Sequence, residues 1–135
     1  KINFNPLVKD HFVVCTQQKI LNSENYLSAL HIGVSSRRTG ILLEDIYLNK
    51  KQFARQIFLR CQHYSTALQV LQQHSTAMLT IPKTILSHLN LSENIKIYEH
   101  PIDLPQLNMG MYWYKDLQDN SRHQFLRDEI NKIFA

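Results

Sequence analysis

Glycine, cysteine and long apolar runs are scarce in this sequence of 135 residues. Its three glycines cannot supply a glycine-rich phosphate loop, a dinucleotide-binding fingerprint or a Gly-x-Ser-x-Gly nucleophile turn. The two cysteines are too few for a disulfide-stapled miniprotein, and both lie in apolar runs, which is typical of a reducing compartment. No apolar run approaches the roughly 20 residues of a membrane helix, and no leader precedes the first predicted strand. We therefore expect one soluble, cytoplasmic domain.

Charge is also sparse, and it is not gathered into a surface. Lys and Arg number 15 against 11 Asp and Glu, which gives a formal net charge of +4. The densest basic points are Arg37–Arg38 and Lys50–Lys51, and a dedicated nucleic-acid surface needs a longer basic stripe. We expect this part of the chain not to contact DNA.

What is present is an alternation of short β-rich runs with helical patterns. This alternation predicts an α/β domain with a mostly parallel sheet, flanking helices and right-handed crossovers. Asn22 or Ser23 is expected to cap the first helix, Ser65 or Thr66 the helix after the third strand, and Asp119 or Asn120 the last helix. Strands are predicted at 12–15, 31–34, 55–61, 76–81, 95–98 and 109–114, and helices at 23–30, 41–52, 66–73, 83–89 and 121–134.

Two polar loops carry the clearest functional signal. Each follows one of two consecutive strands, and ligands of parallel α/β sheets gather at the carboxyl ends of strands, beside helix N-termini that attract anions. The guanidinium of Arg37 favours an anionic small molecule. The candidate side chains are Ser35, Ser36, Arg37 and Thr39 in the first loop, and Tyr64, Ser65 and Thr66 in the second.

Catalytic and metal chemistry are poorly supported. Cys15 and Cys61 read as core thiols, and the seven histidines are scattered without a metal-ligand spacing. His63 beside Ser65 leaves a nucleophile–base pair open, but no acid partner or oxyanion loop is indicated. We expect no enzyme activity, no metal and no cofactor.

Three segments resemble LysR-type transcriptional regulators. Gln69–Pro82 (QVLQQHSTAMLTIP) resembles the helix, strand and proline of their effector-binding domains, although Ser75 and Ala77 replace the usual Gly-x-Gly turn. Met109–Arg127 (MGMYWYKDLQDNSRHQFLR) resembles their last strand and helix. Asp10–Cys15 (DHFVVC) resembles the strand that opens their second subdomain, although Gln18–Lys19–Ile20 replaces the His-Pro that often follows.

The resemblance implies a periplasmic-binding-protein-like (type 2) lobe from the C-terminal part of such a regulator. Residues 11–101 would form the second subdomain, and residues 102–135 would return to a first subdomain that is mostly missing, as is the N-terminal winged helix-turn-helix. An effector would bind in the cleft between subdomains, which adds Thr16 and Gln17 to the candidates above. The resemblance further implies a homodimer or tetramer through the 41–61 helix–strand surface, and DNA contact only through the missing part.

Two other functions remain open on the sequence. A lobe of a solute-binding transport protein would have the same architecture. A small α/β hydrolase would use His63 with Ser65. Replacing His63 by Ala would abolish the activity of such a hydrolase but leave the fold of a sensor intact.

Overall fold

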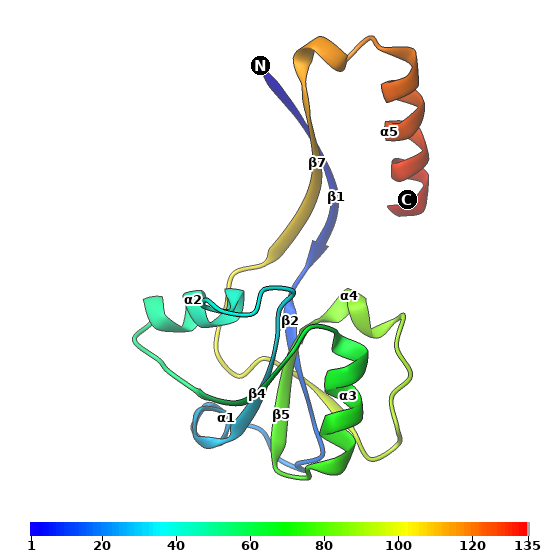
Figure 1. Cartoon of the computed structure of the whole chain (residues 1–135). Coiled ribbons are helices and arrows are strands. Elements are labelled where there is room, and N and C mark those ends of the chain that lie inside the picture. Colours follow the sequence, from blue (N-terminus) through cyan, green and yellow to red (C-terminus); the bar gives the residue numbers. More distant parts are fainter. Residues whose placement is uncertain (135) are drawn as a thin grey trace. The chain divides into compact units, whose positions relative to one another are not determined.

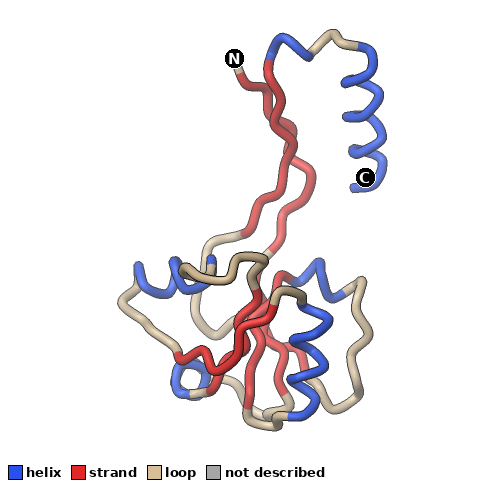
Figure 2. Tube along the Cα trace, viewed as in Figure 1, coloured by secondary structure: helices blue, strands red, loops and turns tan. Residues whose placement is uncertain are grey.

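The computed structural model describes residues 1–134, which form two compact units (Figure 2). The larger unit is continuous and comprises His11–Pro105. The smaller unit combines Lys1–Asp10 with the segment from Gln106 onward. Assigning these units to the subdomains of a larger domain stays a prediction. Within residues 1–134, no helix has both the length and the apolar character needed to cross a membrane.

The larger unit is built on a five-stranded sheet with the order β4-β3-β5-β2-β6. β3 pairs in parallel with β4 and β5, whereas β2 pairs antiparallel with β5 and β6. The predicted α/β class is therefore confirmed, with a sheet that is mixed because β2 runs against its neighbours. The strands are β2 (Phe12–Thr16), β3 (Leu30–Val34), β4 (Gln56–Cys61), β5 (Ala77–Pro82) and β6 (Lys96–Glu99).

Helices cover both faces of this sheet (Figure 1). α3 (Tyr64–Gln73) and α4 (Lys83–Leu86) pack on one face. α1 (Ser23–Ser28) and α2 (Leu43–Lys50) pack on the other. α2 and α4 are shorter than predicted, whereas α1 and α3 lie close to their predicted ranges.

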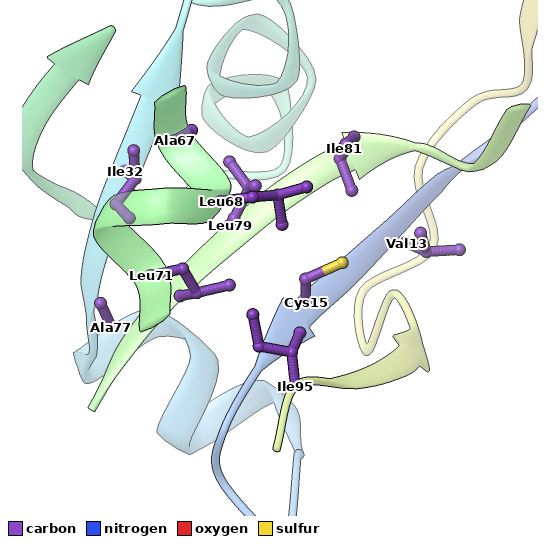
Figure 3. Close-up of a cluster of buried hydrophobic side chains, with 10 residues drawn as sticks. All are labelled: Val13, Cys15, Ile32, Ala67, Leu68, Leu71, Ala77, Leu79, Ile81 and Ile95. Atoms are coloured by element: carbon purple, nitrogen blue, oxygen red, sulfur yellow. The ribbon is translucent and has the colours of Figure 1, made fainter. Parts of the chain in front are cut away.

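Strand alternation divides the core into two clusters, because successive side chains of a strand point to opposite faces. Figure 3 shows the cluster beneath α3, where Leu68 and Leu71 pack toward Ile32 and Leu79. The cluster on the opposite face contains Val14, Tyr26, Leu48, Met78 and Ile102.

Side chains beside the helix starts confirm two predicted caps and overturn a third. Asn22 forms a capping box with Asn25 at α1, and Asn120 Oδ1 accepts from the backbone N–H of His123. The N-cap of α3, however, is His63. Capping by Ser65 or Thr66 was therefore wrong, because the helix begins two to three residues earlier and includes both hydroxyl residues in its first turn.

The smaller unit contains an antiparallel pair of strands and one long helix. β1 (Ile2–Asp10) pairs with β7 (Leu107–Tyr114), and the one-turn 3-10 helix Lys115–Leu117 leads to α5 (Ser121–Phe134). The sequence predicted no strand before Phe12. Pro6 argues against a strand, and the structure accommodates it where the register shifts between Pro6 and Val8.

Polar and aromatic contacts hold α5 against β7 and the short 3-10 helix within this unit. Arg127 is buried, donates to the carbonyls of Leu117 and Gln118, and lies 4.7 Å from the Trp113 ring centroid. Phe4 lies so close to Gly110 that a Cβ there would come within 2.3 Å of its ring. Phe125 is 67% exposed, so α5 presents apolar surface outward.

Candidate functional site

The two polar loops predicted from sequence lie side by side. β3 and β4 are adjacent and parallel, and their last residues, Val34 and Cys61, are paired. Beyond this pair, the N–H of Ser35 donates to the carbonyl of Cys61 at 2.9 Å. The loop at 35–40 and the connection at 62–63 therefore leave the same edge of the sheet. The second loop is shorter than predicted, because Tyr64, Ser65 and Thr66 belong to the first turn of α3. We call this edge, with its two loops, the carboxyl edge.

The first loop is folded back on itself. The N–H of Arg37 donates to Ser35 Oγ at 3.1 Å, and Arg37 Nη2 donates to the carbonyl of Ile41 at 3.0 Å. Gly40 has a φ of 97°, a conformation that favours glycine. The side chains of Ser36, Arg37 and Thr39 remain exposed. The loop thus has a defined shape while keeping polar groups accessible.

Arg60 on β4 binds the carbonyl groups of the same loop. This residue was not among those predicted from the sequence. Its Nη1 donates to the Gly40 carbonyl at 2.8 Å, and its Nη2 to the carbonyls of Thr39 and Arg37 at 3.3 Å each. Its Nε donates to the Arg37 carbonyl at 3.4 Å. Nothing local in the sequence marks these contacts, because they join positions 20 to 23 residues apart.

The second loop leads directly into the N-terminus of α3. The first bond of this helix runs from the N–H of Ala67 to the carbonyl of His63 at 3.2 Å. The amides of Tyr64, Ser65 and Thr66 precede it, so they have no acceptor within the helix. Ser65 and Thr66 are exposed. Their hydroxyls and the helix dipole make this end of α3 favourable for negative charge.

Tyr64 has a different environment from its two neighbours. Its ring packs against the core cluster beneath α3 and is half-buried. Burial, with a smaller contribution from Glu44, raises the pKa of its phenol. The phenol therefore stays protonated and is available as a hydrogen-bond donor.

Thr16 and Gln17 lie at the opposite edge of the sheet, which overturns their predicted place beside the other candidates. β2 runs against β5, so Thr16 pairs with Met78 near the start of β5, and β5 starts beside the start of β3. A five-residue strand, roughly 15 Å long, separates this end of β3 from Ser35. Thr16 Oγ1 donates to the Ala77 carbonyl at 3.0 Å, and Gln17 Nε2 to the Leu71 carbonyl at 2.9 Å.

The carboxyl edge lacks the features of a catalytic or metal site. His63 makes no side-chain hydrogen bond to cap α3. Within residues 1–134, no group of three or more His, Cys, Asp or Glu side chains is arranged to hold a metal ion. The thiol of Cys61 has a pKa raised by burial, so it is not an activated nucleophile.

A buried polar network lies on the sheet face covered by α1 and α2. The fully buried side chain of Arg55 bonds Asp45 at 2.7 Å and Glu44 at 3.0 Å, both in the first turn of α2. Its Nη1 also donates to Tyr26 Oη and Thr80 Oγ1, each at 3.2 Å. These contacts fix α2, which directly follows the first loop, to the strand that bears Arg60.

The chain is similar in sequence or fold to several known transcriptional regulators. No family model matches the chain. The chain is 24% identical to the HTH-type transcriptional activator NahR of Pseudomonas putida over 127 residues. This alignment covers 94% of the chain and 41% of NahR. The regulatory domain of MexT, a transcriptional activator in Pseudomonas aeruginosa, superposes with a TM-score of 0.79 and 14% identity over 99% of this chain and 66% of that one.

The effector-binding domain of BenM with its effector benzoate also matches, with a TM-score of 0.71 and 10% identity over 99% of this chain and 64% of that one. The chain has the fold of LysR-type effector-binding domains. The resemblance predicted from sequence is thus confirmed. NahR and MexT are both transcriptional activators. The chain spans less than half of NahR.

Proposed function

We propose that this chain is the effector-sensing part of a LysR-type transcriptional regulator. A small molecule binds at the carboxyl edge and changes how the whole protein acts on transcription. DNA contact belongs to an N-terminal winged helix-turn-helix outside this sequence, which accords with its sparse positive charge. A regulator of this kind works in the cytoplasm.

One observation carries the proposal. Two polar loops and the N-terminus of α3 meet at one edge of the sheet, and no nucleophile–base pair accompanies them. This arrangement suits reversible binding rather than chemistry. We keep Ser35, Ser36, Arg37, Thr39, Tyr64, Ser65 and Thr66 as the effector-binding residues, without Thr16 and Gln17.

The effector we propose is a small anion, and a carboxylate in particular. The first-turn amides of α3 supply hydrogen-bond donors, and Arg37 and Arg38 supply positive charge at the neighbouring loop. BenM, which shares the fold, binds benzoate. The effector of this chain is expected to share the carboxylate but not necessarily the ring.

Self-association through the 41–61 surface is part of the same proposal. Five large apolar side chains are at least 36% exposed along α2, its preceding loop and β4: Ile41, Leu43, Ile46, Phe58 and Leu59. β4 is an edge strand, so its outer hydrogen-bonding groups face no neighbour in this sheet. Such a surface fits a homodimer or tetramer.

A thermal-shift comparison of benzoate with benzamide tests the effector class. A ligand that binds only the folded chain raises the melting temperature, by about 10 °C at a hundredfold excess over Kd. We expect benzoate, or another small carboxylate of a panel, to raise it and the matched neutral amide not to. Replacement of Arg37 by Gln should reduce the shift. If neutral aromatics stabilise the chain and no carboxylate does, the anionic effector is refuted.

A further inference from the structure

The carbonyl groups of the first loop are almost all engaged by arginine side chains. Arg60 donates to the carbonyls of Arg37, Thr39 and Gly40, and Arg37 donates to that of Ile41. Four of the five carbonyls between 37 and 41 therefore face a guanidinium. Free carbonyl oxygens would repel an anion, so engaging them removes an obstacle to anion binding.

The same contacts orient the amides of this loop. The described chain contains no cis peptide bond, and in a trans peptide the N–H points opposite to the carbonyl. With the carbonyls of Arg37, Thr39 and Gly40 turned toward Arg60, the N–H groups of Arg38, Gly40 and Ile41 point away from it. Two of them, the N–H groups of Gly40 and Ile41, are successive along the chain, and successive backbone N–H groups can donate together to an anion.

We propose that Arg60 is the positioning residue of the effector loop: its guanidinium holds three carbonyls on one side, so that the amides of Arg38, Gly40 and Ile41 can donate to a carboxylate. This inference rests on the proposed function, because it assigns a role within that site. Arg60 itself does not touch the ligand. The guanidinium spreads its five N–H donors over a rigid planar fork, and Arg60 uses two of its nitrogens to reach the three carbonyls, whereas lysine presents its three donors from a single nitrogen.

The test combines ¹⁵N relaxation with benzoate titration for the wild-type chain, Arg60→Lys, Arg60→Gln and the control Arg122→Gln. Both Arg60 variants should lower the backbone order parameters of residues 37–41 below about 0.6, from the roughly 0.85 of rigid backbone. Arg122→Gln, at an exposed position of α5, makes the same charge change as Arg60→Gln and should leave these order parameters and the benzoate affinity unchanged. Loss of preorganisation should weaken benzoate binding about tenfold in both Arg60 variants.

Arg60→Lys keeps the positive charge but changes the geometry of the N–H donors, so it separates a positioning role of Arg60 from a purely electrostatic one. If Arg60→Lys keeps the wild-type order parameters and affinity while Arg60→Gln loses affinity, Arg60 acts through charge alone and the inference is wrong. It is also wrong if neither variant mobilises the loop. If the wild-type chain binds no carboxylate but both Arg60 variants mobilise residues 37–41, the proposed effector fails while the positioning of the loop by Arg60 stands.

Discussion

Two arginines, Arg60 on β4 and Arg55 directly before it, act on the segment that follows β3, and each does so through several bonds at once. Arg60 fixes the loop at 37–40, and Arg55 fixes the first turn of α2 through Glu44 and Asp45. A buried ion pair gains less stability than its geometry suggests, because both charges lose their hydration. Arg55 therefore contributes mainly to the specificity of the fold, because its bonds to Glu44 and Asp45 fix the first turn of α2 against the sheet.

The same network contains two histidines that the fold keeps neutral. Burial is the main reason that the pKa of His31 falls to about 4, with Arg55 as a second cause. Burial likewise lowers the pKa of His100 to about 4. Glu44 has the opposite effect on how stability changes with pH, because burial raises the pKa of its carboxyl.

We predict that the folded chain loses stability as the pH falls from about 6.5 toward 4. A histidine of the unfolded chain titrates near 6.5, so the unfolded state binds more protons over this window and acid favours unfolding. The completely buried His31 alone should cost roughly 3 kcal/mol near pH 4. Urea unfolding at pH 7 and at pH 4.5 measures the loss.

Variants assign this pH dependence to its source. His31→Gln should flatten it by removing one of the groups that resist protonation, whereas His88→Gln, at an exposed position, should not. NMR titration of the wild-type imidazoles gives an independent reading. A native His31 or His100 that titrates near pH 6.5 would show that the network does not hold them neutral.

At the scale of elements, side-chain periodicity predicted most of the larger unit. The apolar runs at Phe12–Cys15 and the 3.6-residue spacing of Ala67, Leu68 and Leu71 identify β2 and α3, because burial imposes those periods. β1 was not predicted: Pro6 is unfavourable inside a strand, and only pairing with β7 makes this segment a strand. Strand direction was beyond local patterns, which is why Thr16 and Gln17 were placed at the wrong edge.

The candidate site was predictable to a similar degree. Polar residues just after two consecutive strands located the loops, because adjacent parallel strands end at one edge. Arg60 and Arg55 could not be foreseen, since an arginine in a strand reads the same whether its guanidinium is solvated or bonded to a distant loop. The pairing register of β3 and β4 decides which segment lies beside each arginine, and this register is seen only in the folded chain.

The exposed surface of α2 and β4 yields a prediction at this scale. Leu43→Lys with Ile46→Lys places two charges on a surface proposed to bury apolar side chains, so self-association should weaken. Sedimentation velocity at several concentrations should show a lower weight-average mass for this variant than for the wild-type chain. The control is Ile20→Lys, at a 71% exposed position outside this surface. Equal weakening by the control, or none by the α2 variant, contradicts the assignment.

At the scale of the whole molecule, we propose that the carboxyl edge of the sheet is the sensing site of a regulator. Two loops and a helix N-terminus converge there, while the edge near Thr16 is held by structural hydrogen bonds. The fold is shared with effector-binding domains across low sequence identity. The loops, rather than the sheet, are therefore where effector specificity is expected to reside.

The most direct test is a ¹H–¹⁵N NMR titration of the chain with small carboxylates, benzoate first. The account predicts saturable chemical-shift changes concentrated at the amides of 35–41 and 63–67, with residues 16–18 unaffected. Thr66→Val, which removes one hydroxyl at the α3 N-terminus, should weaken the titration without moving it elsewhere. Saturable changes confined to residues 16–20, or to the β1–β7 pair, would contradict the placement of the site.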